Sequence, residues 1–107
     1  MIVTVFRSRL SAELAADMII EYKALDARMD TLVVKMPGYI SHKSFMSADG
    51  EEVVIVEFET EEALRAWSAH PEHVAVKRKG NELYFSEYRI QVCSVLRDTA
   101  DRKPKNQ

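Results

Sequence analysis

The chain has 107 residues, of which 47% are hydrophobic, and this is enough for one hydrophobic core but not for two. Its charges nearly cancel to a formal net charge of -2, so the sequence offers no broad cationic face for a nucleic acid. No apolar run is long enough to cross a membrane, and the N-terminus alternates like a strand instead of forming a signal peptide. We therefore expect a cytoplasmic protein with one domain, 1–97, and a polar, disordered tail, 98–107.

The first third of the chain is predicted to form a strand and a long helix. Ile2 to Arg9 is rich in β-branched and aromatic residues, which favours a strand. Ser11 is a candidate N-cap, with Glu13 in the first helical turn where the helix dipole favours an anion. An apolar stripe at helical spacing follows, and Pro37-Gly38 ends it. The stripe consists of Leu14, Met18, Leu25, Met29 and Leu32.

A hairpin is predicted next. Tyr39 to Ala48 and Glu52 to Glu59 read as two strands, and Asp49-Gly50 between them suits a tight turn that needs a positive φ. The hairpin therefore supplies the second and third strands.

The second helical region and the last strand complete the chain. Thr60 is a candidate cap for a helix whose apolar face includes Leu64 and Trp67. Pro71 suits the first position of a new helical segment, with His70 as its cap and Gly80 at its end. Leu83 to Leu96 reads as the last strand, in which the single cysteine, Cys93, is predicted to be a buried and unreactive core residue.

This order predicts an α+β, ferredoxin-like βαββαβ fold, with a four-stranded antiparallel sheet and two helices on one face. The first and third strands are apolar on both of their faces, as in Ile2, Val3, Val5 and Phe6. Helices cover only one face, and an uncovered apolar face would associate with another surface. We therefore expect a homodimer that packs sheet to sheet.

The densest group of reactive side chains has the spacing W-x-x-H-P-x-H, formed by Trp67, His70, Pro71 and His73. Glu-Glu-Ala-Leu precedes it, and a tyrosine-bearing last strand follows it. With the Pro-Gly-Tyr at 37–39, this pattern resembles the antibiotic biosynthesis monooxygenase (ABM) family of dimeric α/β barrels. The resemblance implies a cavity between sheet and helices, in which some members oxidise electron-rich phenols or quinols with O₂ and neither metal nor flavin.

The haem-degrading branch of this family also resembles the chain at Trp67. That branch uses an asparagine on the first strand and an iron-binding histidine about ten residues after the tryptophan. The first strand here has no asparagine, and Lys77 stands ten residues after Trp67, where an ammonium has no lone pair for iron. Haem degradation is thus a weaker alternative, with His73 as its only candidate ligand in that helix.

His73 and Trp67 are the candidate catalytic residues. A histidine handles a proton near neutral pH, which oxidation of a phenol requires. The structural alternatives are that His73 only hydrogen-bonds the corner at Pro71, and that Trp67 is only a core residue. The three histidines match no metal-binding signature, so we expect no metal and no other cofactor.

The second strand supplies further candidates for substrate binding. Neighbouring residues point to opposite faces, so either His42 or Lys43 faces the cavity. His42 would share its face with Ile40, Ser44 and Met46, and Lys43 with Tyr39, Ser41 and Phe45. We take Tyr39, His42, Phe45 and Tyr88 as candidate substrate-binding residues.

The function expected from the sequence is a cofactor-independent monooxygenase acting on a small electron-rich aromatic compound. The alternative from another class is a non-catalytic dimer that binds a small molecule or serves a stress response, with a cavity of similar composition. The resemblance does not name a substrate, because the family's activities diverge on one fold.

Overall fold

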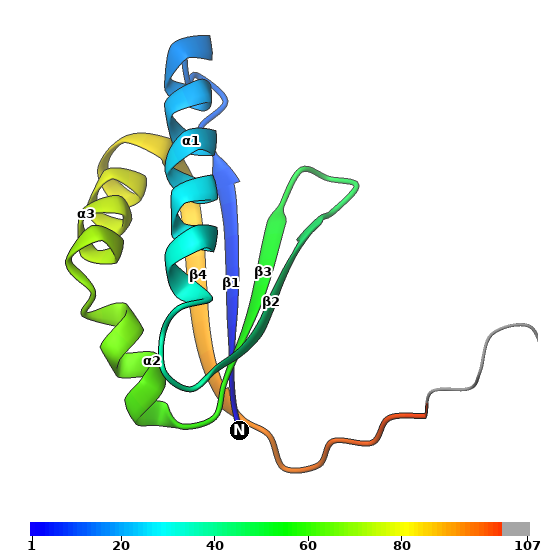
Figure 1. The fold of residues 1–107 in the computed structure, drawn as a ribbon. Helices are drawn as coiled ribbons and strands as arrows, with labels where there is room; N and C mark the ends of the chain where they lie inside the picture. Colours follow the sequence, from blue (N-terminus) through cyan, green and yellow to red (C-terminus); the bar gives the residue numbers. More distant parts are fainter. Residues whose placement is uncertain (102–107) are drawn as a thin grey trace, which may run out of the picture.

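The computed structural model describes residues 1–101 and has one four-stranded antiparallel sheet, ordered β2-β3-β1-β4, with the helices packed on one side (Figure 1). This confirms the ferredoxin-like βαββαβ prediction. Of the predicted tail, 98–101 form neither helix nor strand, and 102–107 lie outside the described residues. The elements are β1 (Ile2–Leu10), α1 (Ala16–Val33), β2 (Tyr39–Met46), β3 (Glu52–Phe58), α2 (Glu61–Ser68), α3 (Pro71–Lys79), a π-helical turn η1 (Gly80–Tyr84) and β4 (Phe85–Ser94).

The local signals that set the turns and later helices are confirmed. The Thr60 hydroxyl accepts a hydrogen bond from the Ala63 N–H at 3.1 Å, which caps α2. His70 Nδ1 accepts from the Glu72 N–H at 3.2 Å, so His70 caps α3 with Pro71 at its first position. Gly50 has a φ of +92°, as the hairpin turn requires.

The predicted start of the first helix is wrong. α1 begins at Ala16, after an Ala15 that gives no side-chain cap. Ser11 instead forms a turn of its own, in which its carbonyl accepts from the Leu14 N–H at 3.1 Å, while its own N–H donates to the Tyr84 carbonyl at 2.8 Å. The backbone of Ser11 is thereby held to the chain before β4, and the helix starts one turn later.

The predicted end of α3 is confirmed, since the helix ends at Lys79 with Gly80 as its C-cap, but the predicted start of the last strand at Leu83 is wrong. Gly80 has a helical φ of −57°, and the chain continues through η1, so β4 starts at Phe85 instead of Leu83. A Cβ at position 80 would lie 2.6 Å from the Phe85 ring, too close for any side chain. Glycine is therefore needed here for close packing of a helix on an aromatic ring, and not for a positive φ.

The two faces of the sheet differ in their cover. The helix-side face carries alternate residues such as Thr4, Phe6 and Phe58, which meet a core of Met29, Val33, Leu64 and Trp67. The outer face carries Val3, Val5, Val53, Ile55 and Cys93. Cys93 is exposed, which corrects the prediction of a buried cysteine: β4 is an edge strand, and nothing among residues 1–101 covers its outer face.

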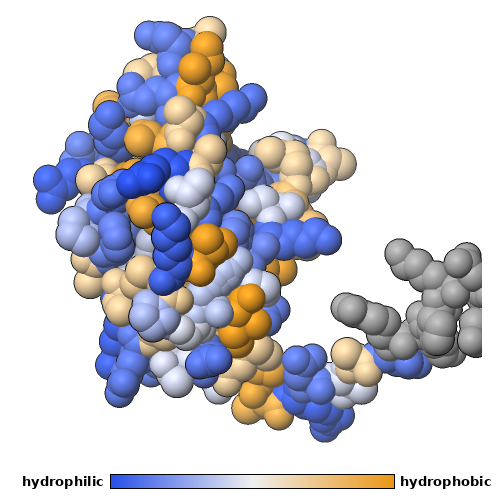
Figure 2. Space-filling view, viewed as in Figure 1, coloured by the Kyte–Doolittle hydropathy of each residue, from blue (hydrophilic) through white to orange (hydrophobic). Residues whose placement is uncertain are grey.

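The surface over the helices is mixed in character. Blue hydrophilic side chains predominate in Figure 2, with orange apolar ones between them and one orange group over the N-terminal part of α1. Ile20, in that part of α1, is 69% exposed. Among residues 1–101, no helix is both long and apolar enough to span a membrane.

Candidate functional site

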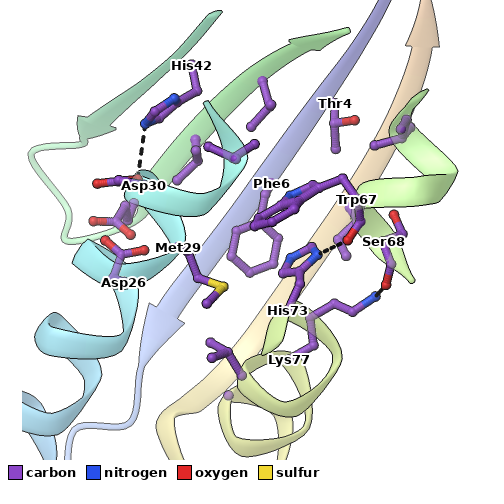
Figure 3. Close-up of a pocket in the computed structure, with 18 of the residues that line it drawn as sticks. Thr4, Phe6, Asp26, Met29, Asp30, His42, Trp67, Ser68, His73 and Lys77 are labelled. Carbon is purple, nitrogen blue, oxygen red and sulfur yellow. Dashed lines mark hydrogen bonds and ion pairs between the residues drawn. The ribbon is translucent and has the colours of Figure 1, made fainter. Parts of the chain in front are cut away.

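A cavity of about 190 Å³ lies between the helix-side face of the sheet and the three helices, as the family resemblance implies (Figure 3). Its middle is apolar and includes Phe6, Met29, Val54 and Val56. Its polar groups gather at two ends. One end, here called the His73 end, consists of Trp67, Ser68, His73 and Lys77; the other, the acidic end, consists of Tyr22, Asp26, Asp30, His42 and Glu52.

Trp67 and His73 are brought together by the corner between α2 and α3. Their rings stack with a centroid distance of 4.3 Å and an interplanar angle of 13°. His73 Nδ1 lies 3.0 Å from the Trp67 carbonyl oxygen. Because a carbonyl only accepts, Nδ1 carries the proton in the neutral ring, and the lone pair is on Nε2. Among the described residues, none forms a hydrogen bond with that Nε2.

The protonation of His73 follows from its surroundings. Burial lowers the pKa of the imidazole to about 4, and the nearby charges of Lys77 and His70 act in the same direction. The hydrogen bond to the Trp67 carbonyl opposes this shift but does not reverse it. His73 is therefore neutral at pH 7, with a free acceptor nitrogen in an apolar cavity.

Trp67 and His73 line the cavity, and they also have the structural roles that were considered as alternatives. Trp67 is only 6% exposed and belongs to the core, yet it also lines the cavity. His73 holds the corner through the Trp67 carbonyl, while the cap of α3 is His70. Lys77, one turn after His73, donates from Nζ to the Ser68 carbonyl at 3.1 Å and brings a positive charge to this end.

The acidic end is built on one line of α1. Tyr22, Asp26 and Asp30 follow each other at intervals of four residues, so they share one face of the helix. The Tyr22 hydroxyl donates to Glu52 Oε1 at 3.0 Å. Burial, with the negative charges of Glu52 and Asp30, raises the pKa of Asp26 to about 6. Burial and Glu52 likewise raise the pKa of Tyr22.

His42 faces the cavity, which resolves the alternative between His42 and Lys43. Its Nε2 lies 3.1 Å from Asp30 Oδ1, and its Nδ1 lies 2.6 Å from the Tyr39 hydroxyl. Both ring nitrogens of His42 thus have a partner. Tyr39 was expected on the opposite face, but β2 has a bulge between Tyr39 and Ser41, where Ile40 is the extra residue. The bulge places Tyr39 and His42 on one face.

The other two candidate residues lie away from the cavity. Phe45 is on the outer face of β2, 46% exposed, with the Lys43 ammonium 5.6 Å from its ring centroid. Tyr88 is 49% exposed and lines a separate polar hollow with Arg7, Glu51, Glu87 and Arg89. The structure therefore groups Trp67, His73 and His42 around one cavity, with Tyr39 behind His42.

Several cavity residues were missed by the sequence analysis, chiefly Thr4, Tyr22, Asp26 and Asp30. The four-residue spacing of the last three was a usable signal, because it draws a polar line beside the apolar stripe of the helix. In the part of the chain that the structure describes, no three His, Cys, Asp or Glu side chains are placed to hold a metal ion.

Comparisons with known proteins identify relatives of the chain. The family model described as antibiotic biosynthesis monooxygenase matches residues 1–79. The uncharacterized protein YqjZ of Bacillus subtilis is 31% identical over 70 residues, which span 65% of this chain and 61% of YqjZ. The matched region is thus about three fifths of that relative's length.

Solved structures share the fold over nearly the whole chain. SnoaB, a cofactor-independent oxygenase from Streptomyces nogalater (N63A mutant), superposes with a TM-score of 0.74 at 16% identity, covering 94% of this chain and 97% of SnoaB. Rv0793 from Mycobacterium tuberculosis gives a TM-score of 0.77 at 21% identity, covering 92% of this chain and 98% of Rv0793.

Proposed function

The chain belongs to the antibiotic biosynthesis monooxygenase family, and from that premise we propose that it oxidises a small electron-rich aromatic compound with O₂ and without a cofactor. The observation that carries the proposal is the free Nε2 of a neutral His73, stacked on Trp67 inside an apolar cavity. SnoaB, which has the same fold, is described as a cofactor-independent oxygenase.

The first step is removal of a proton from the phenol. Nε2 of His73 accepts the phenolic proton, while Nδ1 stays bound to the Trp67 carbonyl. In the empty cavity His73 is a weak base, because its pKa is about 4. The negative charge of a phenolate beside the ring raises that pKa, so binding and proton transfer support each other. The Lys77 ammonium adds a positive charge at the same end, which stabilises the anion.

The oxidation then balances without an external reductant. The phenolate supplies two electrons to O₂, and a C–O bond forms between O₂ and a ring carbon that bears hydrogen. Loss of that C–H proton, cleavage of the O–O bond and protonation of the leaving oxygen by His73 give a quinone and one water. One phenol and one O₂ are thus converted to one quinone and one H₂O, and the apolar wall excludes water that would quench the intermediate.

Oxygen uptake tests this proposal. With 1-naphthol and anthrone as substrates, after chelator treatment and with no flavin or nicotinamide added, we expect uptake above the protein-free autoxidation rate. With ¹⁸O₂, one labelled oxygen atom should enter the product, and no hydrogen peroxide should accumulate. Saturable binding without uptake would instead favour the non-catalytic binding protein, and uptake that yields peroxide without label would show an oxidase.

We further propose that the protein acts as a homodimer through the outer face of its sheet. Val3, Val5, Val53 and Ile55 form an apolar band there that the helices do not cover. Light scattering should therefore give twice the chain mass of 12.3 kDa, and a charged residue at Val53 should convert the protein to monomer. In the reducing cytoplasm, where we place the protein, Cys93 on this face stays a free thiol. A monomeric wild type would contradict this proposal.

A further inference from the structure

The helix α3 covers one side of the cavity without belonging to the buried core. None of its nine residues is buried. The three that are half-buried, His73, Val76 and Lys77, all line the cavity, and the others are exposed. Figure 3 shows His73 and Lys77 extending from this helix towards Trp67. The inner face of α3 is therefore directed at the hollow of the cavity, and burial of apolar surface holds this helix only weakly.

Two ion pairs connect α3 to α1, which runs beside it in the opposite direction (Figure 1). The Arg28 guanidinium donates two hydrogen bonds to the Glu72 carboxylate, at 3.0 and 3.1 Å. Two helical turns away, the Lys79 ammonium donates to Glu21 Oε1 at 3.0 Å. Among the described residues, these α1–α3 ion pairs are the polar side-chain contacts between the two helices. Each helix supplies one cation and one anion, so a displacement of α3 by one turn would lose both pairs.

The α1–α3 ion pairs are weak because they lie at the surface. The exposed fractions of the four side chains are between 41 and 53%. Exposed ion pairs stabilise little, and salt screens them. Glu21 is held in place from the other side, since it also accepts a hydrogen bond from the hydroxyl of the fully buried Tyr84. The contacts between α1 and α3 are thus of a kind that breaks and re-forms readily.

The chain is interrupted at both ends of α3. At its start, His70 has a non-helical ψ of 127°, and Pro71 has no N–H to continue the hydrogen bonding of α2. After Lys79 the chain turns through η1, and π-helical segments are rare and frequent at functional sites. Buried residues lie beyond both interruptions, Trp67 on α2 and Tyr84 at the end of η1. α3 is therefore a separate segment between two anchored points.

We propose that α3 is a lid that admits small molecules to the cavity by moving away from α1, and that the α1–α3 ion pairs latch it shut. This goes beyond the proposed function, because it concerns entry into the cavity and not the reaction. Movement of α3 also takes His73 away from the Trp67 ring, with which it stacks at 4.3 Å. The candidate proton acceptor is then in place only when the lid is closed, so closure over a ligand assembles the His73 end.

The distance between α1 and α3 tests the inference without any ligand. Nitroxide labels would be attached at two exposed positions, Lys23→Cys on α1 and Val74→Cys on α3, in a Cys93→Ser background. Dilution with unlabelled protein removes distances between subunits. Double electron–electron resonance should give one major distance for the closed lid and a longer one for the open lid. Labels at Lys23→Cys and Ala66→Cys, on the exposed side of α2, give the reference distance, which should stay single in every variant.

Removal of the α1–α3 ion pairs should raise the open population. Arg28→Ala and Lys79→Ala should each raise the ratio of open to closed lid roughly 1.5- to 5-fold, as the loss of an exposed ion pair predicts, and the double variant by the product. Sodium chloride at about 1 M should act similarly on the wild type and add little in the double variant. Arg65→Ala is the matched control: it removes an exposed pair with Glu61 inside α2 and should change neither distance.

A small reagent shows whether this movement is the entrance to the cavity. Diethyl pyrocarbonate reacts with the lone pair of a neutral imidazole, and Nε2 of His73 has no partner among the described residues. The rate of modification of His73, followed by mass spectrometry, should rise in the double variant by the same factor as the ratio of open to closed lid. His70 caps α3 and does not line the cavity, so its rate should stay unchanged.

Two results would overturn the inference. One is a single distance between α1 and α3 that neither substitution nor salt changes, because α3 would then be a fixed part of the cavity wall. The other is a changed distance with an unchanged rate of modification at His73, because small molecules would then enter elsewhere. Lid opening with faster modification of His73, in a protein that takes up no oxygen, would support this inference and contradict only the proposed oxidation.

Discussion

The two ends of the cavity each present a histidine, but they leave those histidines in opposite states. At the His73 end one ring nitrogen is bound to a backbone carbonyl, and the other has no partner among the described residues. At the acidic end His42 has both nitrogens engaged, by Tyr39 and by Asp30. A histidine with both nitrogens bonded positions other groups, whereas one with a free nitrogen can accept a proton.

Burial shifts the pKa of one group at each end of the cavity, and the two shifts have opposite signs. It lowers the pKa of His73 and raises that of Asp26, because in both cases the neutral form is favoured. The cavity therefore resists a positive charge at one end and a negative charge at the other. Kinetics and stability measurements on single variants can test this contrast.

The largest expected effect is on the rate. His73→Ala should lower kcat for oxygen uptake by about a hundredfold or more, because the proton acceptor is lost, and the melting temperature should change little. His42→Ala is the matched substitution at the acidic end and should act mainly on KM, with kcat within a few-fold of the wild type. Equal losses of kcat in the two variants would contradict the contrast between a proton-accepting His73 and a positioning His42. Unfolding of His73→Ala would mean that His73 only stabilises the corner between α2 and α3.

The next effect is on stability in acid. Folding lowers the pKa of His73 from 6.5 to about 4. The contribution of the neutral ring to the free energy of unfolding is therefore complete above pH 6.5 and is lost as the pH falls towards 4. This difference corresponds to about 3 kcal/mol in the free energy of unfolding. Urea denaturation at pH 4, 5 and 7 should show that the free energy of unfolding of the wild type declines as the pH falls. In His73→Gln this decline should be smaller by about that amount. Parallel curves would contradict the lowered pKa.

The smallest effect is expected from the acidic end and has the opposite sign. The pKa of Asp26 is raised from 3.8 to about 6, so the folded protein loses stability as the pH rises from about 4 to 6. Asp26→Asn should therefore stabilise the protein at pH 7, by only about 1 kcal/mol because solvent screens this half-buried group. The gain should vanish near pH 4. Asp17→Asn, on the exposed first turn of α1, is the control and should give no gain.

The fold could be predicted because its signals are local. Thr60, the His70-Pro71 pair and Asp49-Gly50 each set a cap or a turn within a few residues. The predictions that failed depended on distant contacts. Ser11 is bound to the Tyr84 carbonyl, and Cys93 is exposed because β4 lies at the edge of the sheet, and neither fact leaves a mark in the nearby sequence.

The candidate site was predictable only in part, for the same reason. The W-x-x-H-P-x-H spacing leads to Trp67 and His73 because a short corner joins them. The alternation of side chains along β2 did not decide whether His42 or Lys43 faces the cavity. It also placed Tyr39 on the wrong face, because a strict two-residue period does not account for a bulge. The positions of Thr4 and Asp26 on the cavity wall depend on how the sheet meets α1, which no single segment encodes.

The extra residue in β2 acts as a phase shift in the strand. If Ile40 were deleted, the pairing with β3 would become regular, and Tyr39 would stay opposite Phe58, two positions from His42 and on the same face. A single-residue deletion would thus remove the bulge and leave Tyr39 on the face of His42, whereas a regular strand that kept all of its residues would turn Tyr39 to the outer face. An ungapped alignment between this chain and a relative with a regular strand would therefore pair side chains from opposite faces before position 40.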